Sequence, residues 1–274
     1  MIVQSGDEIS LAKIAESGQC FRWLKSGEEY CIPHEGKMLR ARQIDERTLE
    51  LDCTEEAFDA VWKPYFDLDT DYGKICERIS QKADPFLYEA IRAQAGVRIL
   101  RQNAWEMLIT SIITQNRNIP AIRNSVELLS QKAGTRCTDE GGRTFFAFPT
   151  PDQLDRMPDE DLSECRLGYR MRYVRCAARA VASGDLDLEN LSFLPDEECV
   201  EKLTALCGVG VKVAACIMLF GLHRLNAFPV DVWMKRILEN EYPDGYSWEA
   251  YSPYNGIYQQ YMFAYYREKA LNRS

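Results

Sequence analysis

Lys212 is the residue best placed to act as a nucleophile. It follows the segment 206–210, Leu-Cys-Gly-Val-Gly, and opens an apolar run that extends to Phe220. The two glycines allow a tight turn with accessible backbone N–H groups, and the run predicts a helix that begins close to Lys212. The positive end of that helix favours the neutral amine that nucleophilic attack requires. Turn amides and a helix N-terminus also suit a phosphate, although most Gly-x-Gly pairs taken alone are ordinary turns.

Asp231 is the acidic group that could work with this amine. It stands 19 positions after Lys212, in the segment Phe-Pro-Val-Asp-Val-Trp-Met that starts at Phe228. A carboxylate there could stabilise positive charge that develops on a substrate. The same residue is also what a plain N-cap of a further helix looks like. Both interpretations remain open at this level.

The charge distribution leaves room for a nucleic-acid partner. The net charge of −9 argues against one at first, but residues 1–97 carry −7 of it and residues 98–274 only −2. The stretch 165–180 contains no acid and five arginines, which are Arg166, Arg170, Arg172, Arg175 and Arg179. Such a patch could hold a phosphate backbone, or it could be a solvated helix face.

Cysteine and histidine usage argues against a metal site and against disulfide bonds. The chain has ten cysteines, none in a Cys-x-x-Cys pair, and two histidines. Most thiols are therefore expected to be small buried groups in a reducing compartment. No secretory signal and no apolar stretch long enough to span a bilayer is visible. We expect a cytoplasmic protein without metal or cofactor.

The elements that must position these residues fall into two regions. Short β-prone runs at 20–23, 30–32, 38–41 and 48–51 alternate with turn formers, which predicts a small antiparallel sheet. From about residue 85 the spacing becomes helical, as in Trp105, Leu108, Ile109, Ile112 and Ile113. Further helices are expected over 119–133 and 170–182. The fold class is α+β, with a sheet domain at 1–97 and a mainly helical domain at 98–274.

The hairpin and the acidic segment together are specific. Residues 206–212 followed by Pro229, Val230 and Asp231 resemble the helix-hairpin-helix and Gly/Pro–Asp motif of the DNA glycosylase superfamily. In lyase-competent members of that superfamily, a lysine occupies the position of Lys212. Some branches add four cysteines after this region for an iron–sulfur cluster. No cysteine follows Cys216, so the resemblance implies no cluster here.

Four other segments resemble the 8-oxoguanine DNA glycosylase/AP lyase branch. They are Gly-Gln-Cys-Phe-Arg-Trp at 18–23, Gly-Val-Arg-Ile-Leu-Arg-Gln at 96–102, Thr-Gln-Asn-Arg-Asn-Ile at 114–119 and Leu-Gly-Tyr-Arg-Met-Arg-Tyr-Val at 167–174. They occur in the family's order and spacing over nearly the whole chain. The resemblance implies that the fold is an N-terminal antiparallel sheet domain followed by a helical helix-hairpin-helix domain.

The resemblance also implies a pocket for the damaged base. The Gly18 carbonyl accepts the N7–H that 8-oxoguanine has and guanine lacks. Gln259 reads the Watson–Crick edge, and Phe263 and Cys216 enclose the ring. Spacing supports this grouping, because Lys212 and Cys216 are four residues apart, as are Gln259 and Phe263. Taken alone, Phe263 is also typical of a core aromatic residue.

Contacts with the rest of the duplex follow from the same resemblance. Asn116 fills the hole left by the flipped base, Tyr169 is the wedge and Arg170 donates to the estranged base. Gly208 and Gly210 hold a phosphate. Trp233 stands where a histidine is common, which changes a phosphate-side contact. Ala121 replaces an arginine that helps animal members to recognise the opposite cytosine, so relaxed opposite-base preference is expected.

These observations predict a monomeric base excision repair enzyme that acts on double-stranded DNA containing 8-oxoguanine. It releases the base and nicks the strand by β-elimination through a Schiff base on Lys212, with Asp231 as the second catalytic residue. One alternative is a related glycosylase for another damaged purine, such as an alkylated one. The other is a non-enzymatic DNA-binding module that uses the hairpin alone. Retention of both Lys212 and Asp231 disfavours the module, because phosphate binding needs neither.

Overall fold

A five-stranded antiparallel sheet forms the N-terminal part of the computed structural model, which describes residues 1–139 and 141–271. The strands are β1 (Ile2–Gln4), β2 (Leu24–Ser26), β3 (Glu29–His34), β4 (Lys37–Gln43) and β5 (Thr48–Leu51), in the order β1-β5-β4-β3-β2. Alternate residues face inwards, so that Ile32 lies opposite Leu39 and Ala41 opposite Leu51 in the register, all of them buried. The predicted antiparallel sheet is confirmed.

Aromatic side chains fill the core beneath this sheet. Trp23, Trp62, Tyr65 and Phe66 pack edge to face or stacked, and the Trp23 indole N–H donates to the Tyr65 hydroxyl over 2.8 Å. The surrounding elements are α1 (Leu11–Glu16), α2 (Glu55–Ala57), a π-helical turn at Phe58–Trp62 and α3 (Lys63–Tyr65). This N-terminal core therefore depends on side chains from segments before, within and after the sheet.

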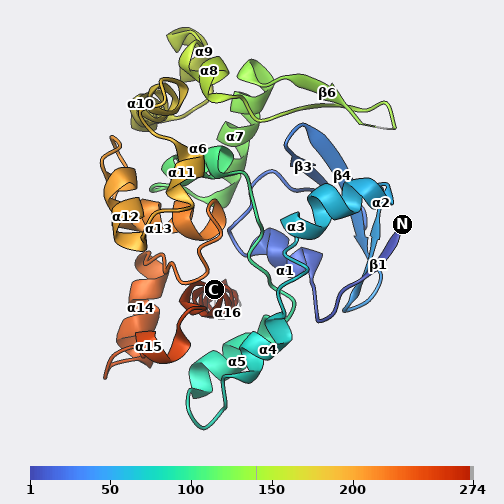
Figure 1. Cartoon of the computed structure of the whole chain (residues 1–274), viewed down its shortest axis with the longest axis vertical. Helices are drawn as coiled ribbons and strands as arrows, with labels where there is room; N and C mark the ends of the chain where they lie inside the picture. Colours follow the sequence, from blue (N-terminus) through green and yellow to red (C-terminus); the bar gives the residue numbers. More distant parts are fainter. Residues whose placement is uncertain (140, 272–274) are drawn as a thin grey trace.

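The remainder of the chain is mainly helical. The helices are α4 (Tyr72–Glu77), α5 (Pro85–Ala93), α6 (Ala104–Ile113), α7 (Ile119–Ala133), α8 (Pro151–Asp155), α9 (Asp159–Glu164), α10 (Met171–Ala182), α11 (Leu188–Leu191), α12 (Asp196–Thr204), α13 (Val211–Phe220), α14 (Val232–Glu241), α15 (Trp248–Tyr251) and α16 (Asn255–Leu271). In Figure 1 the sheet lies on one side, helices α12 to α14 lie on the other, and α16 runs between them. The predicted helix at 119–133 coincides with α7.

One sequence prediction differs from the structure. The run 20–23 forms no strand; β2 begins at Leu24, because Cys20, Phe21 and Trp23 are instead buried against other elements. The structure also contains a two-stranded hairpin that the sequence does not predict, formed by β6 (Arg136–Thr138) and β7 (Thr144–Phe146). This hairpin reaches back to the sheet (Figure 1), where Asp139 pairs with Arg40 at 2.9 Å.

Apolar packing does not follow a single boundary in the sequence. One hydrophobic cluster joins residues 3–66 with Leu100, and the larger one joins Phe21 and α4 to α16. Helix α5, which precedes residue 98, packs against α16. The division into 1–97 and 98–274 as folding units stays a prediction.

A buried polar network fastens the two clusters to each other. The Asp67 carboxylate, 2% exposed, receives hydrogen bonds from the Tyr72 hydroxyl and Arg101 Nε, both at 3.0 Å, and lies 3.2 Å from His223 Nε2. His223 follows α13. Burial alone raises the pKa of Asp67, but hydrogen bonding and the charges of His223 and Arg101 outweigh burial and hold it below its ordinary value. The ionised carboxylate therefore stabilises the fold.

None of the helices described, over residues 1–139 and 141–271, is long and apolar enough to cross a membrane.

Substituting Asp67→Asn tests this network. Asp67 has φ of 51°, a conformation that asparagine also tolerates, so the change removes charge without adding backbone strain. We expect the free energy of unfolding at pH 6 to fall by about 2 kcal/mol. Because the folded-state pKa lies below 3.8, the parent loses this advantage as the pH falls through that folded-state value. Urea unfolding of both proteins from pH 6 to pH 3 measures the difference. A difference independent of pH would show that the charge is unimportant.

Candidate active site

A tight hairpin between α12 and α13 presents backbone amides to solvent. Gly208 has φ of +82°, and Gly210 is the N-cap of α13. The Gly208 carbonyl accepts a hydrogen bond from Gln115 Nε2 at 3.0 Å, which ties the hairpin to the end of α6. Within the described residues, no side chain caps the first amides of α13. These amides and the helix dipole remain available to an anion such as phosphate.

Helix α13 carries Lys212 and Cys216 into the interior on the same face, as their spacing predicted. Lys212 is half-buried and Cys216 is only 8% exposed. Burial raises the pKa of the Cys216 thiol, while hydrogen bonding and the charge of Lys212 oppose the rise. The amine of Lys212 therefore lies against a neutral thiol at the edge of the core.

Asp231 is both an N-cap and a member of the site. Its Oδ1 accepts a hydrogen bond from the Met234 amide at 2.8 Å, which starts α14. The same residue lines the cavity that Lys212 enters. The two interpretations of Asp231 are thus compatible, because the residue that caps α14 also lines the cavity.

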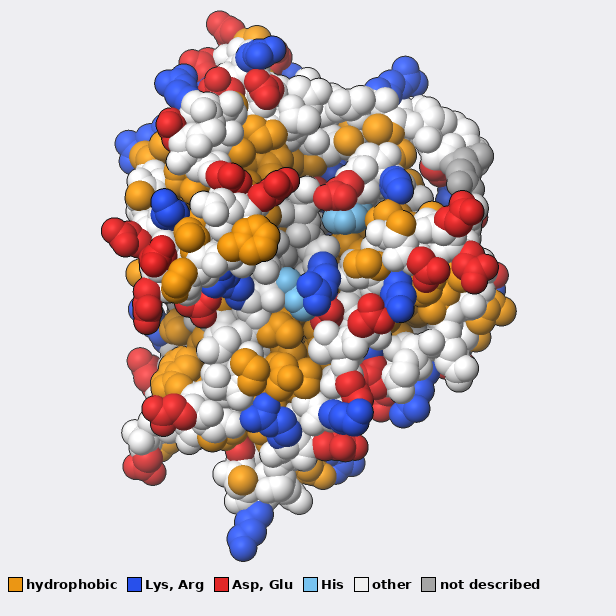
Figure 2. All heavy atoms as spheres, viewed as in Figure 1, with side chains coloured by type: hydrophobic (Ala, Val, Ile, Leu, Met, Phe, Trp, Pro, Cys, Tyr) orange, Lys and Arg blue, Asp and Glu red, His pale blue; other side chains and the backbone are white. Residues whose placement is uncertain are grey.

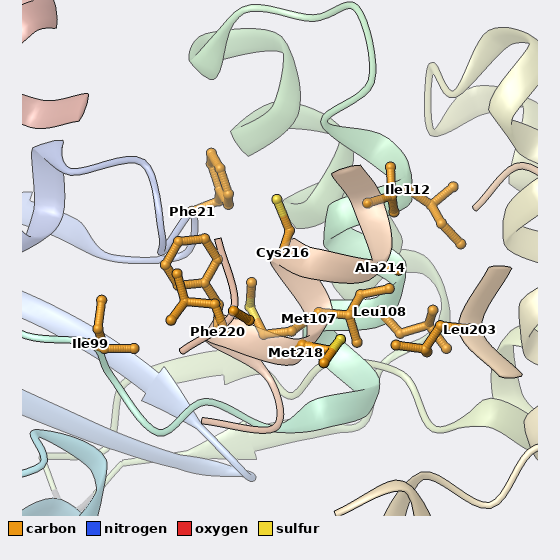
Figure 3. Close-up of a cluster of buried hydrophobic side chains, with 14 of the residues drawn as sticks. Phe21, Ile99, Met107, Leu108, Ile112, Leu203, Ala214, Cys216, Met218 and Phe220 are labelled. Atoms are coloured by element: carbon orange, nitrogen blue, oxygen red, sulfur yellow. The ribbon is translucent and has the colours of Figure 1, made fainter. Parts of the chain in front are cut away.

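A cavity of about 390 Å³, large enough for one base, lies between the two parts of the chain. Gly18 and Phe21 line it from the N-terminal part, Lys212 and Cys216 from α13, and Phe263 from α16. Figure 3 shows Phe21, Cys216 and Phe220 beside one another. These side chains give the cavity an apolar part next to the Lys212 amine.

Of the four residues expected to bind the base, three line the cavity and Gln259 is not among the lining residues. Gly18, Cys216 and Phe263 line the cavity, and an ideal Cβ on Gly18 would lie 3.5 Å from the Phe263 ring. Gln259 is buried on α16 next to the cavity residues, and its Nε2 donates to the Pro229 carbonyl at 3.2 Å. The Gln259 Oε1 atom is buried without a partner among the described residues. This oxygen can therefore still accept a hydrogen bond, and leaving it buried without one is energetically costly.

Asn116 and Tyr169 come together on the surface. Asn116 has φ of 50° and is exposed, and its Nδ2 donates to the Tyr169 hydroxyl at 3.3 Å. Tyr169 is 49% exposed although it is a large aromatic residue. Arg170, in contrast, is buried. Its Nε donates to the Gln115 carbonyl at 2.8 Å, and its guanidinium lies 4.4 Å from the Tyr169 ring.

Only part of the arginine-rich stretch is free to meet DNA. Arg175 donates to carbonyls at the end of α8 and pairs with Asp159 at 2.8 Å, and Arg179 lies 3.5 Å from Asp155. Neighbouring elements therefore occupy these two charges, as the solvated-face interpretation allowed. Arg166 and Arg172 are exposed. On the face shown in Figure 2, acidic and basic side chains are interspersed rather than gathered by sign.

Trp233 and Ala121 mark the two departures from the family pattern. Trp233 lines the cavity, its ring centre lies 6.2 Å from that of Tyr266, and the Arg236 guanidinium lies 5.4 Å from the Trp233 ring. Ala121 is half-buried in the first turn of α7, where its amide donates to the Asn118 side chain. A side chain at position 121 therefore starts close to the exposed Asn116 loop.

Sequence reasoning missed two cations at the cavity. Arg117 and Arg267 both line it. The position of Arg267 four residues after Phe263 was a usable signal, because such residues share a helix face. Arg117 lay inside a recognised motif, but its direction depends on the left-handed backbone at Asn116. Burial lowers the pKa of Arg117, and the nearby charge of Arg170 lowers it further.

Over the described residues, no group of three or more His, Cys, Asp or Glu side chains could hold a metal ion.

The two hairpin glycines give a matched pair for a stability test. A Cβ on Gly208 would lie 2.3 Å from the Tyr173 ring and would also occupy a left-handed conformation, whereas a Cβ on Gly210 meets nothing within 4 Å. We expect Gly208→Ala to lower the free energy of unfolding by about 2 kcal/mol and Gly210→Ala by less than about 0.5 kcal/mol. Urea denaturation measures both. Equal losses would contradict the described hairpin geometry.

Comparisons with known proteins agree with this geometry. Residues 1–108 match the N-terminal domain of 8-oxoguanine DNA glycosylase, and residues 109–243 match the HhH-GPD superfamily of base excision DNA repair proteins. An N-glycosylase/DNA lyase from Arabidopsis thaliana is 30% identical over 85% of this chain and 66% of its own length. The chain thus spans about two thirds of that curated relative.

Solved structures cover the whole fold. The MBOgg1 protein bound to a low-affinity DNA ligand has a TM-score of 0.91 and 35% identity over 98% of this chain and 96% of that one. The Clostridium acetobutylicum 8-oxoguanine glycosylase/lyase, bound to duplex DNA with cytosine opposite 8-oxoguanine, has a TM-score of 0.87 and 35% identity over 98% of each chain. The chain belongs to the 8-oxoguanine DNA glycosylase family of the HhH-GPD superfamily.

Proposed function

We infer that this chain is a DNA N-glycosylase and AP lyase that removes 8-oxoguanine from duplex DNA and then cleaves the strand at the abasic site. One observation carries the inference: Lys212, Asp231 and Cys216 share a single base-sized cavity with Gly18 and Phe263. An amine, a carboxylate and a base-stacking surface in one cavity are what base release with covalent sugar capture requires.

Base selection rests on complementary hydrogen bonding. The Gly18 carbonyl accepts N7–H of 8-oxoguanine, whereas guanine presents a lone pair at N7 and is repelled. Gln259 accepts from the Watson–Crick edge, which carries N–H donors in guanine derivatives. The unpartnered, buried Oε1 of Gln259 supports this role, because base entry satisfies an atom that is otherwise costly to bury. Phe263 and Cys216 enclose the ring.

Duplex distortion requires groups that occupy the space left by the base. Asn116 enters the vacated position, and Tyr169 wedges beside the estranged base. Their mutual hydrogen bond and their exposure support a joint role. Arg170 donates to the estranged base next to them. In the free protein its Nε donates to the Gln115 carbonyl, so this loop must rearrange before Arg170 can reach the base. The hairpin at Gly208 and Gly210 holds a phosphate, and Trp233 contacts the backbone near the lesion.

The chemistry proceeds through the sugar. The Lys212 amine attacks C1′ as the C1′–N9 bond breaks, and the base leaves with the bonding electron pair and takes up the proton that the amine nitrogen gives up. Asp231 stabilises the positive charge that develops on the sugar. Ring opening gives an imine between Nζ and C1′. Loss of a C2′ proton and cleavage of the C3′–O bond then nick the strand, after which water hydrolyses the imine.

Lys212→Gln tests the nucleophile. The variant should retain duplex binding but lose base release by at least about a thousandfold, because no amine remains to attack C1′. Borohydride should trap the parent covalently on an 8-oxoguanine duplex and should not trap the variant. Lys235→Gln, a change at an exposed lysine on α14, is the matched control and should be trapped like the parent. Base release by the variant at the parental rate would exclude Lys212 as the nucleophile.

The same assay separates the alternatives. A DNA-binding module without enzymatic activity would bind the duplex and give no trapped complex. A glycosylase for another purine would be trapped on duplexes with alkylated purines and not on those with 8-oxoguanine.

Opposite-base preference depends on position 121. We propose that Ala121 leaves the opposite cytosine with one cationic partner fewer, so that preference for cytosine is relaxed. Ala121→Arg should raise the ratio of base release opposite cytosine to release opposite adenine by about tenfold, which corresponds to one charge-assisted hydrogen bond. Single-turnover rates on the two duplexes measure the ratio. An unchanged ratio would show that position 121 does not read the opposite base.

We place this activity in the cytoplasm of a prokaryotic cell, on nucleoid DNA, with the chain acting as a monomer. Ten cysteines without a Cys-x-x-Cys pair support a reducing compartment.

A further inference from the structure

We propose that Gln260 and Arg267 on α16 are positioning residues for base discrimination. They hold the loop 16–19 so that the Gly18 carbonyl stays directed into the cavity. The proposal rests on the proposed function, since it concerns how 8-oxoguanine is told apart from guanine. Neither residue is required to touch the reacting atoms.

The carbonyls on either side of Gly18 are all held. Arg267 Nη1 donates to the Glu16 carbonyl at 2.9 Å, and Gln260 Nε2 donates to the Ser17 carbonyl at 2.6 Å. Gln102 Nε2 donates to the Gln19 carbonyl at 2.9 Å. Among the described residues, none donates a hydrogen bond to the Gly18 carbonyl itself. The Gly18 carbonyl is therefore the one acceptor of this loop left for a ligand, and Gly18 lines the cavity.

Burial makes this arrangement rigid. Gln260 and Ser17 are each 2% exposed, so water does not compete for their hydrogen bond. The Ser17 hydroxyl donates to the Ile14 carbonyl at 2.7 Å and accepts from Gln19 Nε2 at 2.9 Å. Loss of the Gln260 amide leaves the Ser17 carbonyl without its partner in a dry environment. The backbone then gains freedom to turn, and Gly18, with φ of +83°, is the residue that turns most easily.

One face of α16 holds both the loop and the stacking ring. Gln260, Phe263 and Arg267 are spaced i, i+3 and i+7, which places them along one side of the helix. The Phe263 ring lies 3.5 Å from an ideal Cβ on Gly18. Helix α16 therefore fixes the position of a base stacked on Phe263 relative to the Gly18 carbonyl that accepts N7–H. Hydrogen-bond strength falls steeply with angle and distance, so discrimination between the bases depends on this relative position.

Comparison of two substrates isolates the positioning role. An 8-oxoguanine duplex needs the Gly18 carbonyl, whereas a duplex with a preformed abasic site has no base to read and needs only the amine. Gln260→Met keeps the length of the side chain and removes the donor. We expect kcat/KM for 8-oxoguanine release to fall about tenfold relative to cleavage of the abasic duplex, with abasic cleavage unchanged. Arg267→Met should lower the same ratio by a smaller factor, because Arg267 is partly exposed.

Lys269→Met is the matched control for Arg267→Met. It removes the same charge from the same helix at an exposed position and should keep the parental ratio. Thermal unfolding of each variant identifies loss of fold. If Gln260→Met does not fold, the ratio measured for Arg267→Met tests the positioning role instead. Equal losses on both substrates, or no change in the ratio for either variant, would overturn the positioning role alone. If the parent cleaves abasic duplex but releases no 8-oxoguanine, the proposed function is wrong and the positioning role falls with it.

Discussion

A fully buried cation is the constraint on which the rest of the structure depends. The Arg98 guanidinium is 0% exposed and is held by Asp7, by Ser5 and by the carbonyls of Asp67 and Thr70. Burial lowers the pKa of Arg98 to about 10. A charge in this position is costly unless its surroundings satisfy it, so these groups must be brought together for the chain to fold. The N-terminal segment and the start of the helical region are thereby fixed to each other.

The loop 16–19 is attached directly to this anchor. The Arg98 carbonyl accepts from Gln19 Nε2 at 2.8 Å, and the Leu100 amide donates to Gln19 Oε1 at 2.8 Å. Gly18 therefore precedes a residue whose side chain is bonded to the backbone beside the buried cation. On the other side, α16 holds Ser17 and Glu16. The carbonyls on both sides of Gly18 are thus kept in place by a rigid interior.

Lys212 and Asp231 are positioned in a different and simpler way, because each lies at the N-terminus of a helix. Lys212 lines the cavity from the first turn of α13, whose first amides no described side chain caps, and Asp231 both caps α14 and lines the same cavity. Capping fixes the position of Asp231 by local hydrogen bonding. Lys212 and Asp231 are therefore placed by local backbone geometry, while the part of the cavity at Gly18 and Phe263 is placed by contacts between distant segments.

This difference explains how far the sequence alone determined the protein. Local rules depend on neighbouring residues, so the helix at 119–133, the shared face of Lys212 and Cys216, and the cap at Asp231 followed from spacing. Motif resemblance added the fold and the family. The tertiary structure alone decided that the run 20–23 is not a strand, because burial of Phe21 at the cavity outweighs local β-propensity. It alone decided that Arg170, Arg175 and Arg179 are engaged by backbone carbonyls or acids. It also brought Arg267 to the Glu16 carbonyl, a contact between residues 251 positions apart that no local pattern encodes.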